Sequence, residues 1–243
     1  MRRTSLAWLT ALALAACASP EPPAAPAPPA EAPALPEPTP IAKGPEVPMA
    51  VRERQRALSE LSHVLDELEP KIGRWPPRIT SASEAHELFA RWRNAFEKAQ
   101  ALDVPGGQDP VTLWLVGSVY RQGHNLDVKG TAELAAARFE SCLALDPTFV
   151  QCHLGLGRLY LASKPEQAVL AEQHLRKARE LYAPSVHPDL EQDITLALLL
   201  QGRTDDALAH IDAYLAEQPG DAHMRDLRNH IAQGHVKLIE IGN

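Results

Sequence analysis

The sequence predicts an all-α repeat protein that follows an N-terminal signal and a proline-rich linker. Twelve of the 22 prolines lie between Pro20 and Pro48, which separates a leader that cannot pack from a longer body. From Val51 onward, alternating β-branched runs are missing, and helix-forming Ala, Leu, Glu, Gln and Arg dominate. Within this body, a pattern of small, bulky and proline residues recurs three times.

Charge, apolar length and cysteine number argue against three classes of protein. The formal net charge is −7 and no cluster of Lys and Arg is visible, which argues against nucleic-acid binding. The apolar run over residues 6–16 is shorter than the ~20 residues of a spanning helix. Three cysteines are too few for a disulfide scaffold.

Residues 1–16 have the composition of a signal peptide. Arg2 and Arg3 supply the positive start, an apolar stretch follows, and Ala15-Ala16 forms a small-residue cleavage site. An ordinary secretory signal that happens to be followed by a cysteine would satisfy these features equally well.

The segment Leu14-Ala15-Ala16-Cys17 also resembles the lipobox of bacterial lipoproteins. This resemblance implies that Cys17 carries the lipid, palmitate included, and becomes the first residue of the mature chain. No Asp follows Cys17, which implies an outer-membrane location with the body facing the periplasm, surface exposure being left open. Loss of Arg2 and Arg3 with the signal moves the formal charge from −7 to −9. The acyl chains must then supply the attachment to the membrane.

The linker over residues 17–48 consists mainly of Pro and Ala. Proline fixes φ and removes a hydrogen-bond donor, so we expect a disordered and extended spacer of polyproline II character. A ligand for PxxP-binding domains is the alternative.

Two N-terminal helices are predicted within residues 49–109, where they could include a degenerate repeat. The first has apolar residues at helical spacing from Val51 to Leu68, and we expect Pro70 to stop it. The second opens at Ser81, three residues before Glu84, which is a capping-box pattern, and ends near Pro105.

Residues 110–221 carry the repeat. In the second helix of each unit, a small residue, a bulky residue, a third position and a proline recur as Ala135, Phe139, Cys142, Pro147; Ala171, Leu175, Ala178, Pro184; and Ala207, Ile211, Tyr214, Pro219. Gly117 and Gly157 mark the first helices of two units. This pattern resembles the tetratricopeptide repeat (TPR), which implies a TPR-like superhelical solenoid of antiparallel helix pairs. The small residue lets two helices cross closely, and the bulky one fills the gap between hairpins.

Residues 222–243 are predicted to form a capping helix, over Asp221–Gln233, and a C-terminal tail. The tail contains a short β-like run from Val236 to Ile241, to which the sequence assigns no partner.

No motif predicts catalysis, a cofactor or a metal site, so we expect a protein that is not an enzyme. Gly155-Leu156-Gly157 lacks the third glycine and the preceding strand of a dinucleotide-binding loop. The histidines offer no three-ligand set, and we expect them, His210 included, to be solvated on the surface. The acidic residues are also expected on exposed faces, so no buried acid–base pair is predicted.

Cys142 and Cys152 are ten residues apart across a predicted helical turn, which brings them within disulfide range. An oxidising periplasm favours the bond. The alternative is two buried free thiols that act as small apolar residues, and neither state is catalytic.

The TPR resemblance also implies a partner groove along the concave face made by the first helices. The positions that it implies are Trp114, Ser118, Arg121, Gln151, Leu154, Arg158, Leu161, Gln192, Leu196 and Leu199. A tryptophan, leucines and two arginines would suit an amphipathic peptide with an acidic group. The alternative is that the N-terminal helices or an insertion fill this groove, which would make these residues core.

Similarity to envelope scaffold and pilotin-type lipoproteins implies a scaffold in an envelope machine, such as type IV pilus, motility or secretion assembly. The expected partners are envelope proteins bound at the concave face, with membrane contact through the lipid only and no nucleic acid. An accessory regulator of a cell-wall enzyme, an outer-membrane assembly factor and a structural spacer are the alternatives.

Overall fold

The computed structural model describes residues 3–6, 51–104, 109–235 and 238–241. Cys17, the linker over residues 17–48 and most of the expected signal peptide lie outside these ranges, so their roles stay predictions. In the described ranges, no helix combines the length and the apolar character that crossing a membrane requires.

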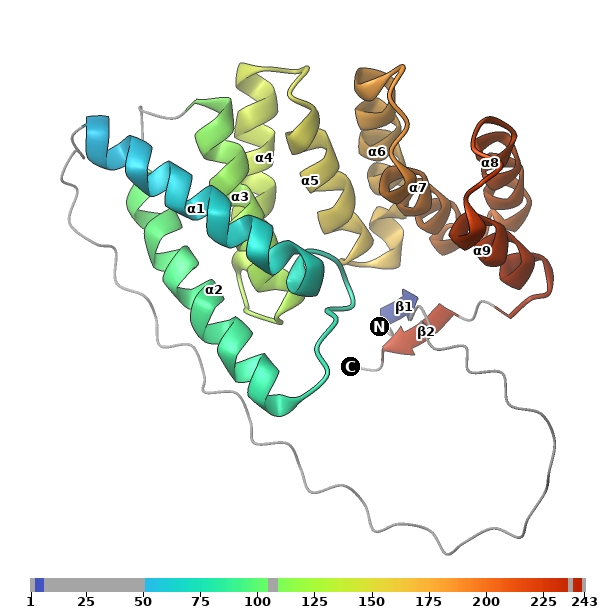
Figure 1. Ribbon diagram of the computed structural model, residues 1–243, viewed down its shortest axis with the longest axis horizontal. Helices are drawn as coiled ribbons and strands as arrows, with labels where there is room; N and C mark the ends of the chain where they lie inside the picture. The colour runs from blue at the N-terminus through green and yellow to red at the C-terminus, as the bar shows by residue number, and fades with distance from the viewer. Residues whose placement is uncertain (1–2, 7–50, 105–108, 236–237, 242–243) are drawn as a thin grey trace, which may run out of the picture.

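The body is built from helices that follow one another in antiparallel pairs (Figure 1). They are α1 (Val51–Ile72), α2 (Ala82–Leu102), α3 (Pro110–Asn125), α4 (Thr131–Leu145), α5 (Val150–Leu161), the 3₁₀ turn η1 (Pro165–Gln167), α6 (Ala168–Tyr182), α7 (Pro188–Leu200), α8 (Thr204–Glu217) and α9 (Ala222–Ala232). The pairs α3/α4, α5/α6 and α7/α8 stack along the molecule, and α9 packs against α8 as the predicted capping helix. The predicted fold class, an all-α TPR-like solenoid, is confirmed.

Helices of one pair approach closely where the first helix has a glycine. A Cβ on Gly117 would lie 2.8 Å from Cε1 of Phe139, and one on Gly157 would lie 2.6 Å from Cδ2 of Leu175. Phe139 also reaches the next pair, because a Cβ on Gly155 would lie 2.5 Å from its Cζ. The bulky residue of the repeat therefore needs the glycines, as the sequence pattern predicts.

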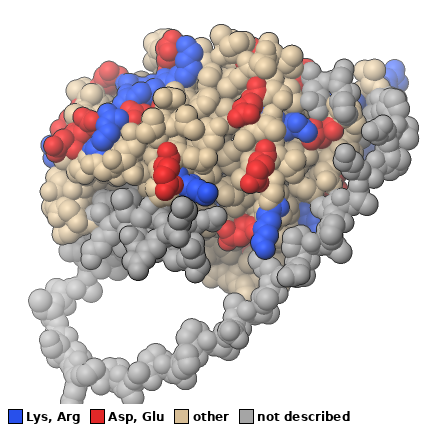
Figure 2. Space-filling model, turned by 180° about the vertical axis from the view of Figure 1, so that it is seen from behind, with Lys and Arg blue, Asp and Glu red and all other residues tan. Residues whose placement is uncertain are grey.

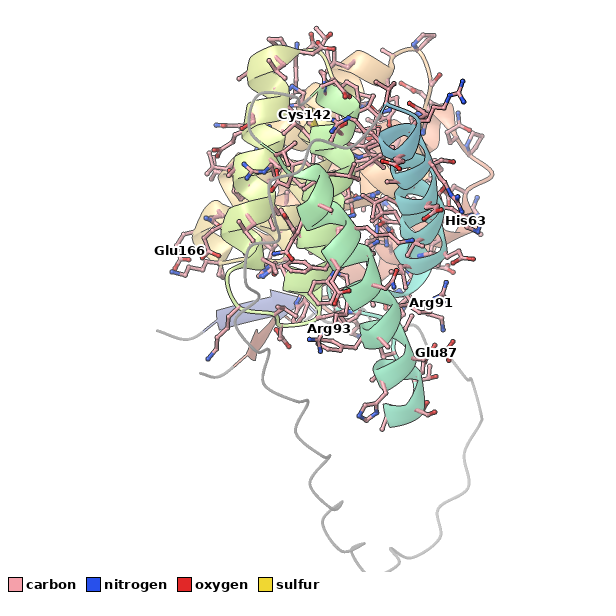
Figure 3. All side chains as sticks on the ribbon, turned by 90° about the vertical axis from the view of Figure 1, so that its left-hand side faces the viewer. His63, Glu87, Arg91, Arg93, Cys142 and Glu166 are labelled. Atoms are coloured by element: carbon pink, nitrogen blue, oxygen red, sulfur yellow. A yellow bond between two sulfur atoms is a disulfide. The ribbon has the colours of Figure 1, made fainter. Side chains whose placement is uncertain are left out.

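The N-terminal hairpin of α1 and α2 lies against the first repeat. α1 contacts both α2 and α3, and it crosses in front of α3 in Figure 1. Figure 3 shows this hairpin from the side, with His63 on α1, Glu87 on α2, and Arg91 on α2, whose guanidinium pairs with Glu67 of α1. α2 begins at the predicted cap, where the Ser81 hydroxyl accepts a hydrogen bond from the Glu84 N–H at 3.1 Å.

The predicted end of the first helix is wrong, because α1 continues through Pro70 to Ile72. A proline in the last turn removes only one N–H of the helical ladder. The Gly73 N–H then donates to the Glu69 carbonyl at 3.0 Å, so the helical pattern continues past the proline. Ile72 is fully buried, and this packing offsets the cost of the lost hydrogen bond.

Buried apolar side chains form two clusters, which we call the N-terminal core and the C-terminal core. The N-terminal core extends over α1 to α5 and contains the large aromatic residues Trp92, Phe96, Tyr120 and Phe139. The C-terminal core extends over α6 to α9 and is composed mainly of Ala, Leu, Ile and Met, with Tyr214 as its aromatic residue. The two cores meet where α5 packs against α6.

A two-stranded antiparallel sheet joins the ends of the described chain. β1 (Arg3–Leu6) pairs with β2 (Leu238–Ile241), with Arg3 opposite Ile241 and Leu6 opposite Leu238. The β-like run of the tail thus pairs with a segment inside the predicted signal peptide. Cleavage before Cys17 would remove β1, so the helical body is the part that a mature lipoprotein would retain.

Candidate functional site

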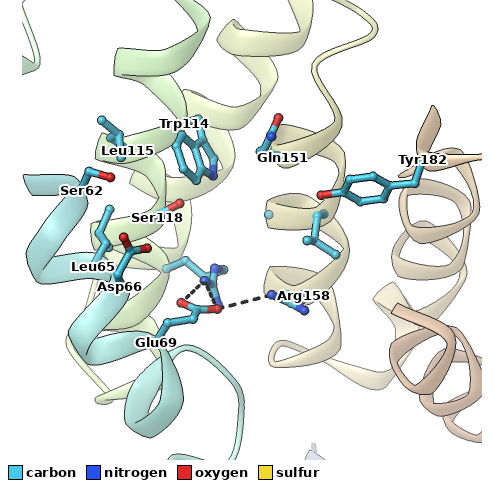
Figure 4. Close-up of a pocket in the computed structure, with 13 residues that line it drawn as sticks. Ser62, Leu65, Asp66, Glu69, Trp114, Leu115, Ser118, Gln151, Arg158 and Tyr182 are labelled. Atoms are coloured by element: carbon cyan, nitrogen blue, oxygen red, sulfur yellow. Dashed lines mark hydrogen bonds and ion pairs between the residues drawn. The ribbon is translucent and has the colours of Figure 1, made fainter. Parts of the chain in front are cut away.

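A pocket opens on the inner side of the solenoid, between α1, α3 and α5 (Figure 4). Its volume is about 240 Å³. Its walls are lined by Ser62, Leu65, Asp66 and Glu69 of α1, Trp114, Leu115, Ser118 and Arg121 of α3, Gln151, Leu154, Gly155 and Arg158 of α5, and Tyr182 of α6. The pocket combines apolar walls with several polar groups, the composition expected of a recognition site.

The structure brings one part of the predicted groove together and leaves another part elsewhere. Six of the predicted positions line the pocket: Trp114, Ser118, Arg121, Gln151, Leu154 and Arg158. Four do not: Leu161, Gln192, Leu196 and Leu199. Gln192 accepts a hydrogen bond from Arg74 at 3.3 Å, and Leu199 is buried in the C-terminal core. Leu161 and Leu196 are half-buried against that core.

The floor of the pocket is a network of charged side chains from three helices. Glu69 accepts hydrogen bonds from Arg121 at 3.0 Å and from Arg158 at 3.3 Å, shown as dashed lines in Figure 4. Arg158 also donates through Nε to Asp193 of α7 at 2.9 Å. Arg121 has a further buried bond to the Gly73 carbonyl. The two predicted groove arginines therefore hold α1, α3, α5 and α7 together.

Arg74, in the turn after α1, extends this network to the next repeat. Its guanidinium donates to the Asp189 carbonyl at 2.9 Å and to Asp193 Oδ2 at 3.1 Å. It also lies 3.4 Å from Asp189 Oδ1. The segment from Glu69 to Arg74 thus contacts α3 and α5 at one end and α7 at the other.

The pKa shifts of these groups report the same pairing. Burial by itself would raise the pKa of the Glu69 carboxyl, but Arg121 and Arg158 outweigh it and hold that pKa below its ordinary value. Burial lowers the pKa of Arg121, against the pull of Glu69. Burial also opposes the charge on Arg158, yet Asp193 and Glu69 raise its pKa. For Glu69 and Arg158 the pairing outweighs burial, so the charged forms of these two groups stabilise each other.

This compensation corrects the predicted chemistry of the groove. The sequence favours a partner with an acidic group because it places two arginines on the inner face. In the structure both guanidiniums already have carboxylate partners, Glu69 and Asp193. Releasing either arginine for a ligand would break an existing ion pair of a guanidinium that is only 5% (Arg121) or 15% (Arg158) exposed, which is unfavourable. An acidic ligand group therefore gains little at this floor.

Two polar side chains of the pocket have no such partner in the described chain. Ser118 is only 6% exposed, and its hydroxyl makes no hydrogen bond to any described residue. In Figure 4 that hydroxyl is directed into the pocket. Asp66 is exposed on α1, one turn before Glu69, and forms no ion pair with any described residue. Asp66 and Glu69 are not among the predicted groove residues, because α1 lies outside the recognised repeats.

The structure joins Cys142 to Cys152 in a disulfide, with a Cα–Cα distance of 6.5 Å. Both cysteines are fully buried. The bond ties the end of α4 to the start of α5, and so joins the first helix pair, α3/α4, to the second, α5/α6. It has no place in the pocket.

The expectation that histidines and carboxylates lie on the surface is wrong for His210 and Glu191. His210 Nε2 lies 2.9 Å from Glu191 Oε2, and the two side chains are 7% and 3% exposed. Neither atom has a well-directed hydrogen bond, although the two lie within ion-pair distance. Arg179 completes it by donating to Glu191 Oε1 at 2.9 Å. Such pairs are invisible to hydrophobic periodicity.

A second histidine contact lies between α5 and α6. His153 Nδ1 and His174 Nδ1 are 3.0 Å apart, so one ring donates and the other accepts. Burial, and then the neighbouring His153, lower the pKa of His174 to about 4. Among the described residues, no group of three or more His, Cys, Asp or Glu is placed to hold a metal ion.

No protein-family model matches the sequence, and no curated protein matches it. Among solved structures, the chain is similar to a thermophilic TPR protein in Thermus thermophilus, with 18% identity over 75% of this chain and 92% of that chain. The TM-score of this match is 0.49. The helix pairs and the pocket described above stand on the contacts of this chain's own residues.

Proposed function

We propose that this chain is a non-catalytic scaffold of the cell envelope, whose solenoid binds a segment of a partner protein in the pocket between α1, α3 and α5. The carrying observation is the pocket itself: a cavity on the inner face with a half-buried tryptophan, Trp114, and a hydroxyl, that of Ser118, which has no hydrogen-bond partner among the described residues. A hydroxyl that opens into the cavity can form a hydrogen bond with the main chain of a bound segment. The cavity of about 240 Å³ is smaller than typical sites for drug-sized ligands, roughly 300–1,000 Å³, and suits one large side chain.

The rest of the surface offers less to a specific partner. Figure 2 shows the face opposite to that of Figure 1, where acidic and basic side chains are scattered among uncharged ones. Among the described residues, exposed large apolar side chains form no larger group in sequence than the neighbours Val169 and Leu170 at the start of α6, and Leu145 lies by itself at the end of α4. The pocket is the place where apolar and unpaired polar groups converge.

The anchor and the linker complete the proposal. Acyl chains on Cys17 would hold the protein at the outer membrane, and the linker over residues 17–48 would set how far the body reaches from it. Tethering raises the effective concentration of a bound partner near the membrane without any new contact. A pilus, motility or secretion machine is the proposed setting, and regulation of a cell-wall enzyme or outer-membrane assembly is the alternative.

Site-specific photocrosslinking in cells tests the binding site. A photoreactive phenylalanine analogue replaces Gln151 at the pocket rim, and the control carries it in place of Leu145, which is 58% exposed at the end of α4. We expect one protein to crosslink from position 151 and to be lost when Trp114→Ala is added. Equal labelling from both positions would exclude the pocket as the site.

The anchor is tested separately by Cys17→Ala. We expect this variant to leave the outer-membrane fraction while its circular dichroism and melting temperature stay those of the parent body. A variant that still fractionates with the outer membrane would show that lipid on Cys17 is not the attachment. The crosslinking result stands or fails independently of this one.

A further inference from the structure

Among the described residues around the pocket, the charges do not balance. Three arginines, Arg74, Arg121 and Arg158, interact with three carboxylates, Glu69, Asp189 and Asp193. The fourth carboxylate, Asp66, lies on the rim of the pocket and has no cationic partner in the described chain. The rim therefore carries one unpaired negative charge beside an internally neutral floor.

The geometry of α1 makes this charge available to a ligand. Ser62, Asp66 and Glu69 lie four and three residues apart, so they share the helix face that borders the pocket. Glu69 points to the floor, where two arginines hold it, while Asp66 stays exposed above it. A cation bound to Asp66 would also relieve the repulsion between these two neighbouring carboxylates.

The apolar and polar walls define the rest of the ligand. Leu65, Trp114 and Leu154 surround the cavity, so they favour one bulky apolar side chain. The Ser118 hydroxyl opens into the cavity, where the main chain of a peptide can form a hydrogen bond with it. Tyr182 and Gln151 add polar groups on the opposite side, as Figure 4 shows.

We infer that the pocket recognises a protein segment that places one large apolar side chain into the cavity and a lysine or arginine next to it on Asp66. This inference rests on the proposed function and specifies the partner's chemistry. It reverses the sign that the sequence predicts for the partner, because the two arginines of the groove are neutralised inside the chain.

Selection from a random peptide library tests the chemistry without knowing the partner. The bait is the full lipidated chain in nanodiscs, and peptides that also bind the Trp114→Ala bait are discarded. We expect enriched sequences with an aromatic or aliphatic residue within about four positions of Lys or Arg. An acidic consensus, or no enrichment over the Trp114→Ala bait, would overturn the inference.

The enriched peptide then serves as a defined probe, together with a copy in which its basic residue is replaced by Glu. On the wild-type chain, we expect the basic peptide to bind more tightly. Asp66→Asn should weaken it about three- to fivefold, the scale of an exposed ion pair. Asp66→Lys should reverse the preference between the two peptides. Asp226→Asn, on an exposed acid of α9, is the matched control and should change neither affinity. An unchanged preference with Asp66→Lys would contradict the inference.

Ser118→Ala separates binding from folding. The hydroxyl has no partner in the free chain, so its removal should leave the melting temperature unchanged or raise it. The same change should weaken the selected peptide severalfold. A parallel loss of melting temperature and affinity would assign Ser118 to the core instead.

The two proposals fail in different ways. If the partner crosslinks at position 151 through an acidic segment, identified by mass spectrometry, the scaffold function stands and the basic ligand is wrong. If nothing crosslinks from the pocket, the proposed binding site itself is wrong.

Discussion

In the N-terminal half of the solenoid, large aromatic rings fill the space between helices, and the Cys142–Cys152 disulfide joins α4 to α5. Trp92, Phe96 and Tyr120 form a chain of ring contacts, with centroids 5.2 and 5.4 Å apart. In the C-terminal half, small aliphatic residues pack the core, and charged side chains such as Glu191 are buried with partners. The N-terminal core is therefore packed by large rings and closed by a disulfide, whereas the C-terminal core is packed by small aliphatic residues and has a buried ion pair beside it. The charge network of the N-terminal half lies at the pocket floor.

This difference has a consequence for local stability. Aromatic and disulfide contacts are insensitive to salt and to moderate pH, whereas compensated charges respond to both. We expect amide hydrogen exchange to be slowest in α3 and α4 and faster in α8 and α9. The changes below test this contrast, from the largest expected effect to the smallest.

Phe139→Ala should destabilise the protein most, because Phe139 is fully buried and faces both Gly117 and Gly155. Glycine has no side chain, so neither Gly117 nor Gly155 can fill the space that the ring leaves. The free energy of unfolding, measured by urea titration, should fall by about 3–5 kcal/mol. Leu145→Ala, at an exposed position of α4, should cost less than about 0.5 kcal/mol. A similar small effect of both changes would show that the N-terminal core does not depend on this ring.

Removing the disulfide with Cys142→Ala and Cys152→Ala should lower the free energy of unfolding by about 3 kcal/mol. Closing a loop between cysteines ten residues apart removes about this much conformational entropy from the unfolded chain. Dithiothreitol should lower the melting temperature of the wild-type chain and leave that of the double variant unchanged. A reductant effect on the double variant as well would point to a cause other than this bond.

Glu191→Ala should remove about 2 kcal/mol from the C-terminal half, since it leaves His210 and Arg179 without their shared carboxylate. Hydrogen exchange should rise in α7 and α8 while α3 stays protected. Glu217→Ala, at the exposed end of α8, is the control and should be neutral within about 0.5 kcal/mol. Loss of protection in α3 would mean that the two cores unfold as one.

The His153–His174 contact at the junction of the cores should make stability fall between pH 6.5 and pH 4. The pKa of His174 is lowered from 6.5 to about 4 in the folded chain, so in this window the unfolded chain binds a proton that the folded chain does not. Stability is fully present above pH 6.5 and decreases as the pH falls, by about 1–2 kcal/mol. His174→Gln should flatten this part of the profile, while His223→Gln, at an exposed position, should not. Parallel profiles for the wild type and His174→Gln would contradict the assignment.

Arg74→Gln should have the smallest effect on global stability, less than about 1 kcal/mol, because the guanidinium is partly exposed and Asp193 keeps Arg158. Its effect should appear as faster exchange at the start of α7. Arg93→Gln, which breaks an exposed pair within α2, should leave α7 unchanged. Faster exchange throughout the molecule would show that Arg74 supports the whole fold.

Local patterns in the sequence predicted the helix pairs, the close approach at Gly117 and Gly157 and the capping helix. They also placed six groove residues that line the pocket. They could not place Glu69 or Asp66 at the pocket, because periodicity shows which face of α1 is buried and does not show which helix covers that face. Glu69 and Arg158 are 89 residues apart in sequence. The buried pair of Glu191 and His210 escaped for a related reason, since polar residues that satisfy one another leave no apolar signal.

Ion pairs run from Glu69 to Arg158, from Arg158 to Asp193 and from Asp193 to Arg74, which is five residues after Glu69, and Arg121 of α3 joins them at Glu69. In a solenoid, each repeat contacts mainly its immediate neighbours. Here a closed circuit links α1, α3, α5 and α7, so stretching the first two repeats requires breaking ion pairs at its floor. A pulling force applied at the N-terminal end of the body would therefore act first on the helices that these ion pairs connect. Helices α8 and α9 lie outside this set of ion pairs.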